Sequence, residues 1–352
     1  MKAQTFPMAQ ALACAILAGA LVGAQEARAQ DAVADFYRGK QVNIIVGFAP
    51  GGGYDTYARL LARHMTSHMP GRPVFVVRNM FGAAGEMAAG FVANAAPKDG
   101  TSIASVSASQ PLARIFIPAS HRSYDPALQH YLGSAARDEF VCLMRVDAPV
   151  KTADDMFRIE SILGSGAVGS GTLSYMPLLA QKLLGTKVKL IHGYKGTIEV
   201  MAALEKGEIN GLCGMNYTSV SSQFQHFLQN GVARIVVQES VGGDARLNAA
   251  NIPRMYDYAK TDQQRRIMRT IYAQADFARP FFVAGGVPED RVAALRAAFM
   301  GSLADKELLT EATKLNLTIE PIPGSAIQAI VAGIAREPES FIDEVKAAIN
   351  LK

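Results

Sequence analysis

Between residues 42 and 65, the spacing of apolar residues changes from that of a strand to that of a helix. Val42 to Val46 is rich in β-branched residues, which predicts a buried strand. From Tyr54 to Met65, apolar residues recur at positions 54, 58, 61 and 65, the spacing of one helix face. Three glycines, Gly51 to Gly53, separate the two patterns, and Asp55 stands in the first turn of the helix. The pattern predicts a strand, a glycine turn and a helix in direct succession.

The glycine turn between these elements has the properties of an anion-binding site. The first N–H groups of a helix lack partners within the helix, and the helix dipole favours negative charge near them. Glycine lets a ligand approach the backbone closely. We therefore expect the turn to bind a carboxylate or a phosphate.

A second strand–turn–helix unit follows at once. Val74 to Val77 predicts a strand, and the turn from Arg78 to Gly85 leads into a helix from Glu86 to Ala95. Thr101 to Val106 predicts a third strand. Because right-handed crossovers place every such turn beyond the carboxyl ends of parallel strands, both turns should lie at one edge of the same sheet. Two turns side by side can hold one small anion.

The middle of the chain repeats this alternation. The predicted elements are a strand from Phe140 to Val146 that crosses between lobes, a strand ending at Leu163, a glycine turn from Gly164 to Thr172, a helix from Tyr175 to Leu184, a strand from Val188 to Ile191, a helix from Ile198 to Lys206 and a strand from Glu208 to Leu212. Gly164, Gly166 and Gly169 match G-x-G-x-x-G, but the next strand ends without the carboxylate that would bind a dinucleotide ribose. The hydroxyl groups in this turn suit a carboxylate ligand equally well.

The length of the chain predicts two lobes. About 320 residues remain beyond the first 29, more than one hydrophobic core comfortably holds. The alternation of strands and helices favours an α/β protein with a mostly parallel sheet in each lobe. We expect residues 30–138 and 275–352 to form lobe 1 and residues 139–274 to form lobe 2, with hinge segments near 137–140 and 276–280.

The N-terminus has the three parts of a secretory signal peptide. Lys2 supplies the positive charge, Met8 to Ala24 the apolar segment, and Ala27 to Ala29 the small-residue cleavage site. The apolar stretch is short for a membrane span. We expect residues 1–29 to be removed after Ala29 and the mature protein to be exported to the periplasm.

Charge and cysteine content narrow the function further. Without Lys2, Arg28 and Glu26, the 35 basic and 31 acidic residues leave a net charge near +3, with no run of lysine or arginine typical of nucleic-acid binding. The mature chain keeps two cysteines, Cys142 and Cys213. In an oxidising compartment they can form a disulfide or remain two buried thiols, and the sequence leaves both open.

Motifs for catalysis are missing. There is no Walker A sequence and no serine with glycine two positions away on both sides. His64 and His68 stand four apart, but Met65 occupies the position where a zinc protease has glutamate, so we interpret them as a solvated helix face. We expect no catalytic residue, no metal ion and no cofactor. Asp55 could contact a ligand, but a carboxylate would repel an anion, which favours a role in ordering the turn.

With these turns placed, the chain resembles the Bug-type substrate-binding proteins of tripartite tricarboxylate transporters. The matching segments are IIVGFAPGGGYDTYARLLA, RNMFGAAGEMAAGFVANAAPKDG, GSGAVGSGT and GYKGTIEVMAALEKGEINGLCG. They occur in the family's order and span most of the mature chain. The resemblance implies a monomeric periplasmic binding protein of the type II, Venus-flytrap class. Such a protein captures a small carboxylate between two lobes and delivers it to the large and small membrane subunits of a transporter.

The resemblance also implies which residues hold the ligand. In the family, backbone groups and ordered waters of the two lobe 1 turns hold the carboxylate, and lobe 2 supplies further partners. Carried onto this sequence, the ligand-binding residues are Phe48, Ala49, Gly52, Gly53, Asp55, Gly82, Ala84, Gly85, Ser165, Ser170, Thr172, Tyr194 and Lys195.

Two departures from the family pattern affect this interpretation. Tyr54 replaces the usual threonine or small residue, and Glu86 follows the second turn, where it could repel a second ligand carboxylate. Two other functions remain open. One is a sensory binding protein that signals to a membrane kinase, and the other is a periplasmic enzyme acting on a carboxylate, because one fold hosts many functions.

Overall fold

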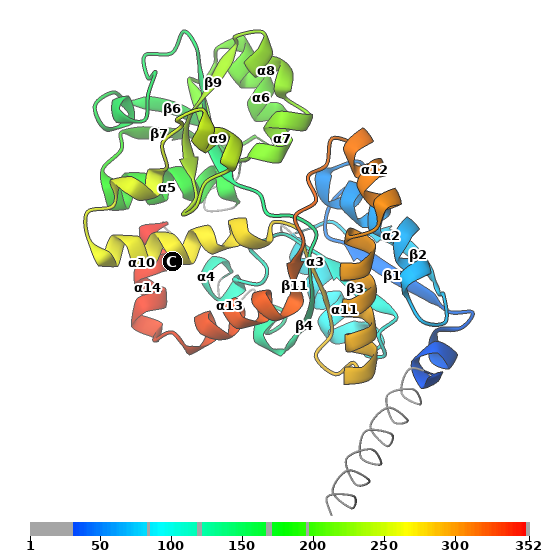
Figure 1. Cartoon of the computed structure of the whole chain (residues 1–352). Helices are drawn as coiled ribbons and strands as arrows, with labels where there is room; N and C mark the ends of the chain where they lie inside the picture. The colour runs from blue at the N-terminus through cyan, green and yellow to red at the C-terminus, as the bar shows by residue number, and fades with distance from the viewer. Residues whose placement is uncertain (1–30, 83–84, 118–121, 167–170, 195–196, 350–352) are drawn as a thin grey trace, which may run out of the picture.

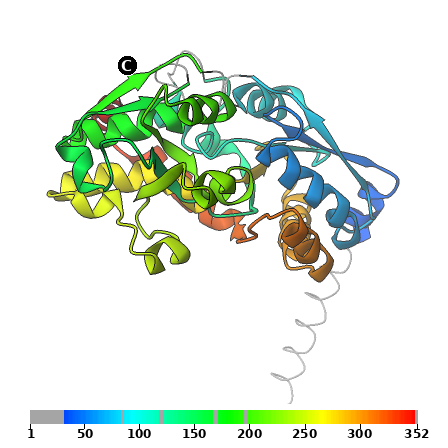
Figure 2. The ribbon, with the colours of Figure 1, turned by 90° about the horizontal axis from the view of Figure 1, so that it is seen from above.

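The computed structural model describes residues 31–82, 85–117, 122–166, 171–194 and 197–349, which form two β-sheets with helices around them. The predicted signal peptide and its cleavage site lie outside these residues. Figures 1 and 2 show the elements of the two sheets on opposite sides of the molecule, with the first strand–helix unit in blue and the second sheet mainly in green.

The first sheet combines strands from both ends of the described chain. Its six strands, in spatial order, are β11 (Ile322–Pro323), β4 (His130–Ser134), β10 (Pro280–Val283), β3 (Ser102–Ser105), β1 (Gln41–Val46) and β2 (Val74–Asn79). β1 pairs in parallel with both β2 and β3, so the two predicted turns do lie at one edge of this sheet. β10 is antiparallel to β3 and β4, and β11 is antiparallel to β4. β1 to β4 therefore share one direction.

The second sheet is built from a continuous stretch of the chain. Its five strands, in spatial order, are β7 (Val188–Ile191), β6 (Ser161–Gly164), β8 (Gly211–Asn216), β5 (Phe140–Arg145) and β9 (Ala233–Glu239). β6 is parallel to β7 and β8, whereas β5 is antiparallel to β8 and β9. The predicted α/β class with mostly parallel strands is confirmed.

Helices surround both sheets. Their bounds are α2 (Gly53–His68), α3 (Glu86–Gly90), η2 (Phe91–Ala95), α4 (Ala113–Phe116), η4 (Pro126–Leu128), η5 (Asp154–Phe157), α5 (Thr172–Leu184), α6 (Thr197–Lys206), α7 (Tyr217–Ser222), α8 (Gln225–Gln229), α9 (Ala245–Ala249), η6 (Met255–Tyr258), α10 (Asp262–Tyr272), η7 (Ala273–Phe277), α11 (Glu289–Leu303), α12 (Lys306–Lys314), α13 (Gly324–Arg336) and α14 (Glu339–Ala348). None of the helices within the described ranges has the length and apolar character that crossing a bilayer requires.

Two predicted elements differ in detail. The helix expected from Glu86 to Ala95 is α3 followed by the π-helical turn η2. The strand expected from Glu208 begins only at Gly211, because Gly207 takes a left-handed conformation with φ +76° and the chain turns until residue 210. In both cases apolar spacing gives the element type and misses a local backbone irregularity.

One hydrophobic core extends across both sheets on the side of the C-terminal helices. It joins residues of the first sheet, such as Ala104, to residues of the second, such as Val237. α10 packs on α14, which also contacts α4 and α5 (Figure 1). The two sheets are thus connected through a shared layer of helices as well as through the chain crossings at residues 135–139 and 278–279.

A disulfide links Cys142 on β5 to Cys213 on β8, two neighbouring antiparallel strands of the second sheet. This resolves the choice that the sequence leaves open. Both residues are fully buried, with 0% of their surface exposed.

We expect loss of this bridge to destabilise the protein by about 2–4 kcal/mol, because the bridge closes a long loop and restricts the unfolded chain. The sequence separation of the two cysteines is 71 residues. Urea unfolding of the Cys142→Ala/Cys213→Ala double variant under oxidising conditions measures the change. If the wild-type protein unfolds at the same urea concentration with and without a reductant, the bridge does not contribute as stated.

Candidate functional site

The first turn is ordered by Asp55 at the start of α2. Asp55 Oδ2 accepts hydrogen bonds from Gly51 N and Arg59 Nε, each at 2.8 Å, and Oδ1 accepts one from Asn79 Nδ2 at 2.8 Å. Burial raises the pKa of the Asp55 carboxyl, but the hydrogen bonds from Arg59, Gly51 and Asn79 outweigh it and lower the pKa overall. Asp55 therefore uses its oxygens within the turn, as the repulsion argument favours.

Asn79, at the end of β2, ties the second turn to the first. Its Nδ2 also donates to Phe48 O at 2.9 Å. The two turns touch, because a Cβ atom built on Gly47 would lie only 2.6 Å from Gly85 Cα. Asn79 was not among the predicted site residues, although a polar amide at the carboxyl end of a strand is a signal for such a role.

Glu86, the first residue of α3, is hydrogen-bonded to Ser123, outside both turns. Its Oε1 accepts hydrogen bonds from Ser123 N and Ser123 Oγ, both at 2.8 Å. The side chain is buried, with 8% of its surface exposed. One carboxylate oxygen is therefore held by the segment after α4, whereas the other, Oε2, has no hydrogen-bond partner among the described residues. The expected repulsion of a second ligand carboxylate stays a prediction.

The turns of the second sheet bring Ser165 and Tyr194 together. Ser165 N donates to Ile191 O at 2.9 Å, and Tyr194 N donates to Ser165 O at 3.4 Å. Ser165 Oγ is fully buried and has no hydrogen-bond partner among the described residues. A buried hydroxyl group without a hydrogen-bond partner favours a role for this turn in binding a ligand.

A cavity of about 200 Å³ lies between the two sheets. It is lined from the first sheet's side by the start of α2 and from the second by the starts of α5 and α6 and by β8 and α7. Its lining residues are Gly52, Gly53, Tyr54, Thr172, Thr197, Ile198, Gly214, Met215, Asn216, Ser219, Gln223, Phe224 and Arg279.

The cavity gathers some of the predicted site residues. Gly52, Gly53 and Thr172 line it. Phe48 lies one layer behind, because its ring stacks on the ring of Tyr54 with centroids 4.2 Å apart. The other described candidates are not among the lining residues: Ala49, Asp55, Gly82, Gly85, Ser165 and Tyr194. Three candidates lie outside the described residues: Ala84, Ser170 and Lys195.

Arg279 is the cavity residue that the sequence did not reveal. It lies between η7 and β10, and only 4% of its surface is exposed. Its guanidinium carbon lies 4.7 Å from the centre of the Tyr54 ring, a cation–π contact. A lone arginine before a strand has no sequence signal, because its burial depends on the packing of the two sheets.

The charge of Arg279 is shared with Asp138, which lies on the other chain crossing. Arg279 Nη2 is 3.3 Å from Asp138 Oδ2, and Asp138 also accepts hydrogen bonds from Thr218 N, at 3.0 Å, and from Thr218 Oγ1. Burial raises the pKa of the Asp138 carboxyl, and Arg279 and Thr218 only partly oppose this. The pair holds the two crossings together, as does the hydrogen bond from Arg279 N to Ser134 Oγ at 3.0 Å.

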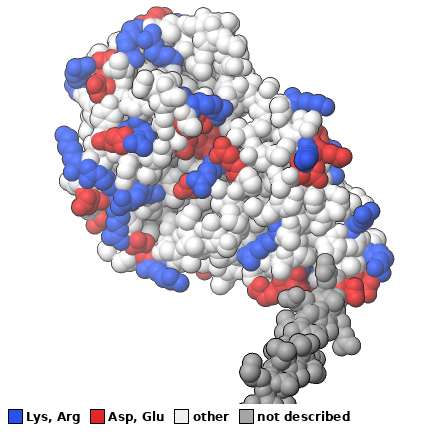
Figure 3. Space-filling model, in the orientation of Figure 1, with Lys and Arg blue, Asp and Glu red and all other residues white. Residues whose placement is uncertain are grey.

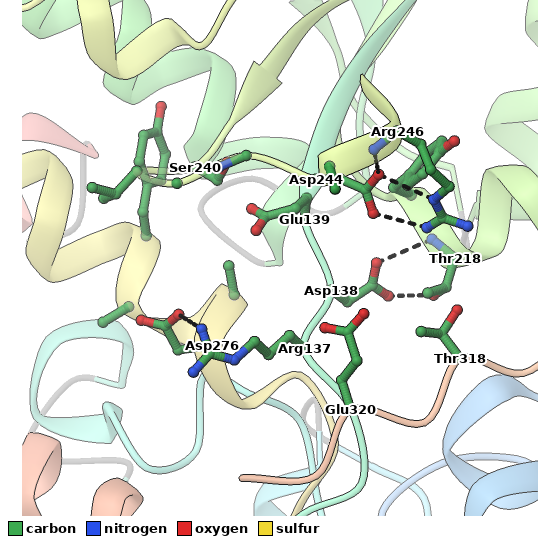
Figure 4. A pocket seen from close by; sticks show the side chains of 18 of the residues that line it. Arg137, Asp138, Glu139, Thr218, Ser240, Asp244, Arg246, Asp276, Thr318 and Glu320 are labelled. Carbon is green, nitrogen blue, oxygen red and sulfur yellow. Dashed lines mark hydrogen bonds and ion pairs between the residues drawn. The ribbon is translucent and has the colours of Figure 1, made fainter. Parts of the chain in front are cut away.

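A larger cavity, of about 800 Å³, lies beyond Asp138 (Figure 4). None of the predicted site residues lines it. Its described lining contains three arginines and five acids, Asp138, Glu139, Asp244, Asp276 and Glu320. Arg137 pairs with Asp276 and Arg246 with Asp244, as the dashed lines in Figure 4 show. This excess of acids disfavours an anion, so we place the site in the smaller cavity despite its size.

The histidines on α2 contact another helix. His64 Nε2 lies 2.9 Å from Glu311 Oε2, and His68 Nε2 lies 2.9 Å from Asp305 Oδ2. The expectation of a solvated face is wrong here, because α12 packs on this side of α2. Cys142 and Cys213, which lie close to Glu239, are joined to each other and do not offer free thiolates for a metal ion.

The charged surface gives no sign of a macromolecular ligand on the face that Figure 3 shows. Basic and acidic side chains are interspersed there over both halves of the molecule. A continuous basic stripe, typical of nucleic-acid binding, does not occur on this face.

Comparisons with known proteins agree with the architecture. No family model matches the sequence. The chain is 29% identical over 217 residues to a UPF0065 protein of a Pseudomonas species, covering 58% of this chain and 59% of that protein. It is 31% identical over 217 residues to a UPF0065 protein of Agrobacterium vitis, covering 60% of each. The chain thus spans about three fifths of the length of these curated relatives.

Solved structures share the fold over nearly their whole length. A TctC solute-binding protein from Polaromonas superimposes with a TM-score of 0.63 at 20% identity, covering 89% of this chain and 99% of that one. The periplasmic binding protein BugD gives 0.62 at 21% identity, covering 89% and 98%. MatC from Rhodopseudomonas palustris, with bound malate, gives 0.61 at 20% identity, covering 88% and 99%. The resemblance predicted from the motifs and the two-lobed binding-protein fold are confirmed.

Proposed function

We propose that this chain is a periplasmic receptor that captures a small carboxylate in the cavity between its two sheets. The observation that supports this most directly is the composition of that cavity. Backbone at the N-terminus of α2, at Gly52 and Gly53, meets the buried cation Arg279 there. Helix N-terminal N–H groups and a guanidinium both favour a carboxylate. The malate bound by MatC, a protein of the same fold, fits this class of ligand.

The proposal includes closure of two lobes around the ligand. The lobes would be residues 30–138 with 275–352 and residues 139–274, in keeping with the strands that each sheet contains. Residues from both sides line the cavity, so a ligand that touches both favours the closed arrangement by its difference in affinity for the two states. The crossings near residues 137–140 and 276–280 would act as hinges.

The receptor would deliver its ligand to the large and small membrane subunits of a tripartite tricarboxylate-type transporter. The support for this step is the likeness to TctC and BugD and the signal peptide predicted for residues 1–29. A monomer suffices for the role, because the cavity is formed by one chain. We expect deletion of the gene to abolish uptake of the ligand if the protein serves transport, and to leave uptake unchanged if it serves a membrane sensor.

A thermal-shift screen of the exported protein against a panel of carboxylates tests the binding function. A ligand at a hundred times its dissociation constant stabilises the folded state by about 2.7 kcal/mol. The chain has no tryptophan, so an external dye or calorimetry should report unfolding. The amide of each acid is the matched control, since it keeps the shape and removes the charge.

The protein for this screen should first be unfolded and refolded without a reductant, which releases co-purified ligand and keeps the disulfide intact. We expect a shift with one chemical group of acids and none with their amides. Absence of a shift with every acid would contradict the receptor function. Conversion of a bound acid into a product would instead show an enzyme.

A further inference from the structure

The position of Arg279 is fixed by its backbone hydrogen bonds and by two aromatic rings, and this prepares its charge for binding a ligand. Its backbone is fixed at both sides, because Arg279 N donates to Ser134 Oγ at 3.0 Å and Arg279 O accepts from Ala135 N at 3.2 Å. Its guanidinium lies over the rings of Tyr54, at 4.7 Å, and Tyr57, at 5.4 Å. An arginine held this way loses little conformational entropy when it binds a ligand.

The guanidinium is not saturated by the protein. It carries five N–H donors. Nη1 donates to Ala278 O at 3.0 Å, and the guanidinium also forms a hydrogen bond with the Tyr54 side chain. The Nε atom is buried without a hydrogen-bond partner among the described residues. The contact from Nη2 to Asp138 is 3.3 Å, longer than the 2.7–2.9 Å typical of a charge-assisted hydrogen bond. Donor capacity therefore remains for an anion.

The described lining of the cavity carries a single charged side chain, that of Arg279. The other side chains of the lining are uncharged, some apolar or aromatic and some polar: Tyr54, Ile198, Met215, Phe224, Thr172, Thr197, Asn216, Ser219 and Gln223. A second carboxylate enclosed here would lose its water without gaining a cation, which is costly. An uncharged group does not carry this cost.

We propose that Arg279 forms the ion pair with the ligand's carboxylate, and that the cavity selects acids with a single carboxylate on an otherwise uncharged body. This inference rests on the proposed receptor function and specifies its substrate class. Arg279 is then the residue that determines specificity for charge, while the N-terminus of α2 supplies backbone donors to the same group. The cavity volume of about 200 Å³, below the roughly 300–1,000 Å³ of pockets for drug-sized ligands, favours a small acid.

Asp138 competes with the ligand for Arg279 in this arrangement. The carboxylate of Asp138 has hydrogen bonds from Thr218 in addition to its contact with Arg279. Replacing Asp138 by asparagine keeps an acceptor for Thr218 and removes the competing charge. We therefore expect Asp138→Asn to bind the ligand more tightly than the wild-type protein.

Calorimetric titration with two matched pairs of acids tests the selection of one charge. Hexanoate and adipate both have six carbons, and adipate has one more carboxylate. Terephthalate is benzoate with a second carboxylate on the ring. We expect the acid with one carboxylate to bind at least about tenfold more tightly in each pair, which corresponds to about 1.4 kcal/mol. Tighter binding of adipate or terephthalate would overturn the proposed selectivity.

Variants of Arg279 test the ion pair itself. We expect Arg279→Met to weaken binding of the preferred acid by at least about 50-fold, as is usual when one partner of a buried charge pair is removed. Arg246→Met is the matched control, because Arg246 lies on α9, outside both hinge segments, is 54% exposed and pairs with Asp244 at the larger cavity. It should leave the affinity unchanged. Full affinity in Arg279→Met would exclude Arg279 as the anchor.

Stability needs a separate check, because Arg279→Met leaves Asp138 buried without its cation. The double variant Arg279→Met/Asp138→Asn removes both charges and should fold while remaining deficient in binding. The single variant Asp138→Asn should gain affinity, and a loss of affinity there would contradict the competition. If some acid binds the wild-type protein while Arg279 variants bind equally well, this inference fails and the receptor function stands. If no acid binds the wild-type protein, the receptor function itself fails.

Discussion

Replacing Gly53 with valine is expected to abolish carboxylate binding, with a loss of roughly a thousandfold or more, and to leave the fold intact. Gly53 is the first residue of α2 and lines the cavity. A Cβ atom built there would have Arg279 Nη2, 3.6 Å away, as its nearest neighbour, so the backbone tolerates a side chain. The valine methyl groups would then occupy the space in front of the helix N–H groups and the guanidinium. Two or more charge-assisted hydrogen bonds of about 1.5–3 kcal/mol each would be lost.

The matched control for this variant is Gly242→Val. Gly242 lines the larger cavity, and a Cβ atom built there has no neighbour within 4 Å. Thermal unfolding should show that both variants remain folded, and calorimetric titration should show that Gly242→Val alone keeps the wild-type affinity. If Gly242→Val abolishes binding while Gly53→Val does not, the ligand occupies the larger cavity and our placement of the site is wrong.

Much of this site follows from local sequence signals. The change from β-branched residues to helical spacing, with three glycines between, predicts both the first turn and its contact with the second. Asp55 is predictable as a residue that orders the turn, because an acid at a helix N-terminus is stabilising with or without a ligand. These features depend on neighbours in the sequence, or on a rule that applies to every parallel strand pair.

Local sequence signals do not reveal contacts between segments that are far apart in the sequence. Arg279 and Asp138 come from two crossings that are separated by more than a hundred residues, and neither stands in a motif. The position of α12 against His64 and His68 is of the same kind. The disulfide is intermediate, because composition and compartment make it plausible, whereas only the register of β5 and β8 brings Cys142 close to Cys213.

Glu239, at the end of β9, is a buried acid behind the cavity residue Gly214. Its surface is 0% exposed, and one oxygen accepts a hydrogen bond from Gly214 N, while Gly214 itself lines the cavity. The other oxygen, Oε1, has no hydrogen-bond partner among the described residues. Burial raises the pKa of Glu239 from 4.5 to about 8, and the Gly214 N–H only partly opposes this.

We therefore expect Glu239→Gln to gain stability over the wild-type protein as the pH rises from 4.5 to 8, by roughly 4 kcal/mol in the free energy of unfolding. Between these values the wild-type folded state holds a proton on Glu239 that the unfolded chain has released. The stability of the folded state is then complete below pH 4.5 and falls by about 1.4 kcal/mol per pH unit until Glu239 ionises near pH 8. Glutamine keeps the acceptor for Gly214 and does not titrate. Urea unfolding of both proteins from pH 4.5 to 9 measures the difference, with Glu205→Gln, an exposed acid on α6, as the control. A difference that stays constant over this range would show that Glu239 ionises at its ordinary pH and that its burial costs little.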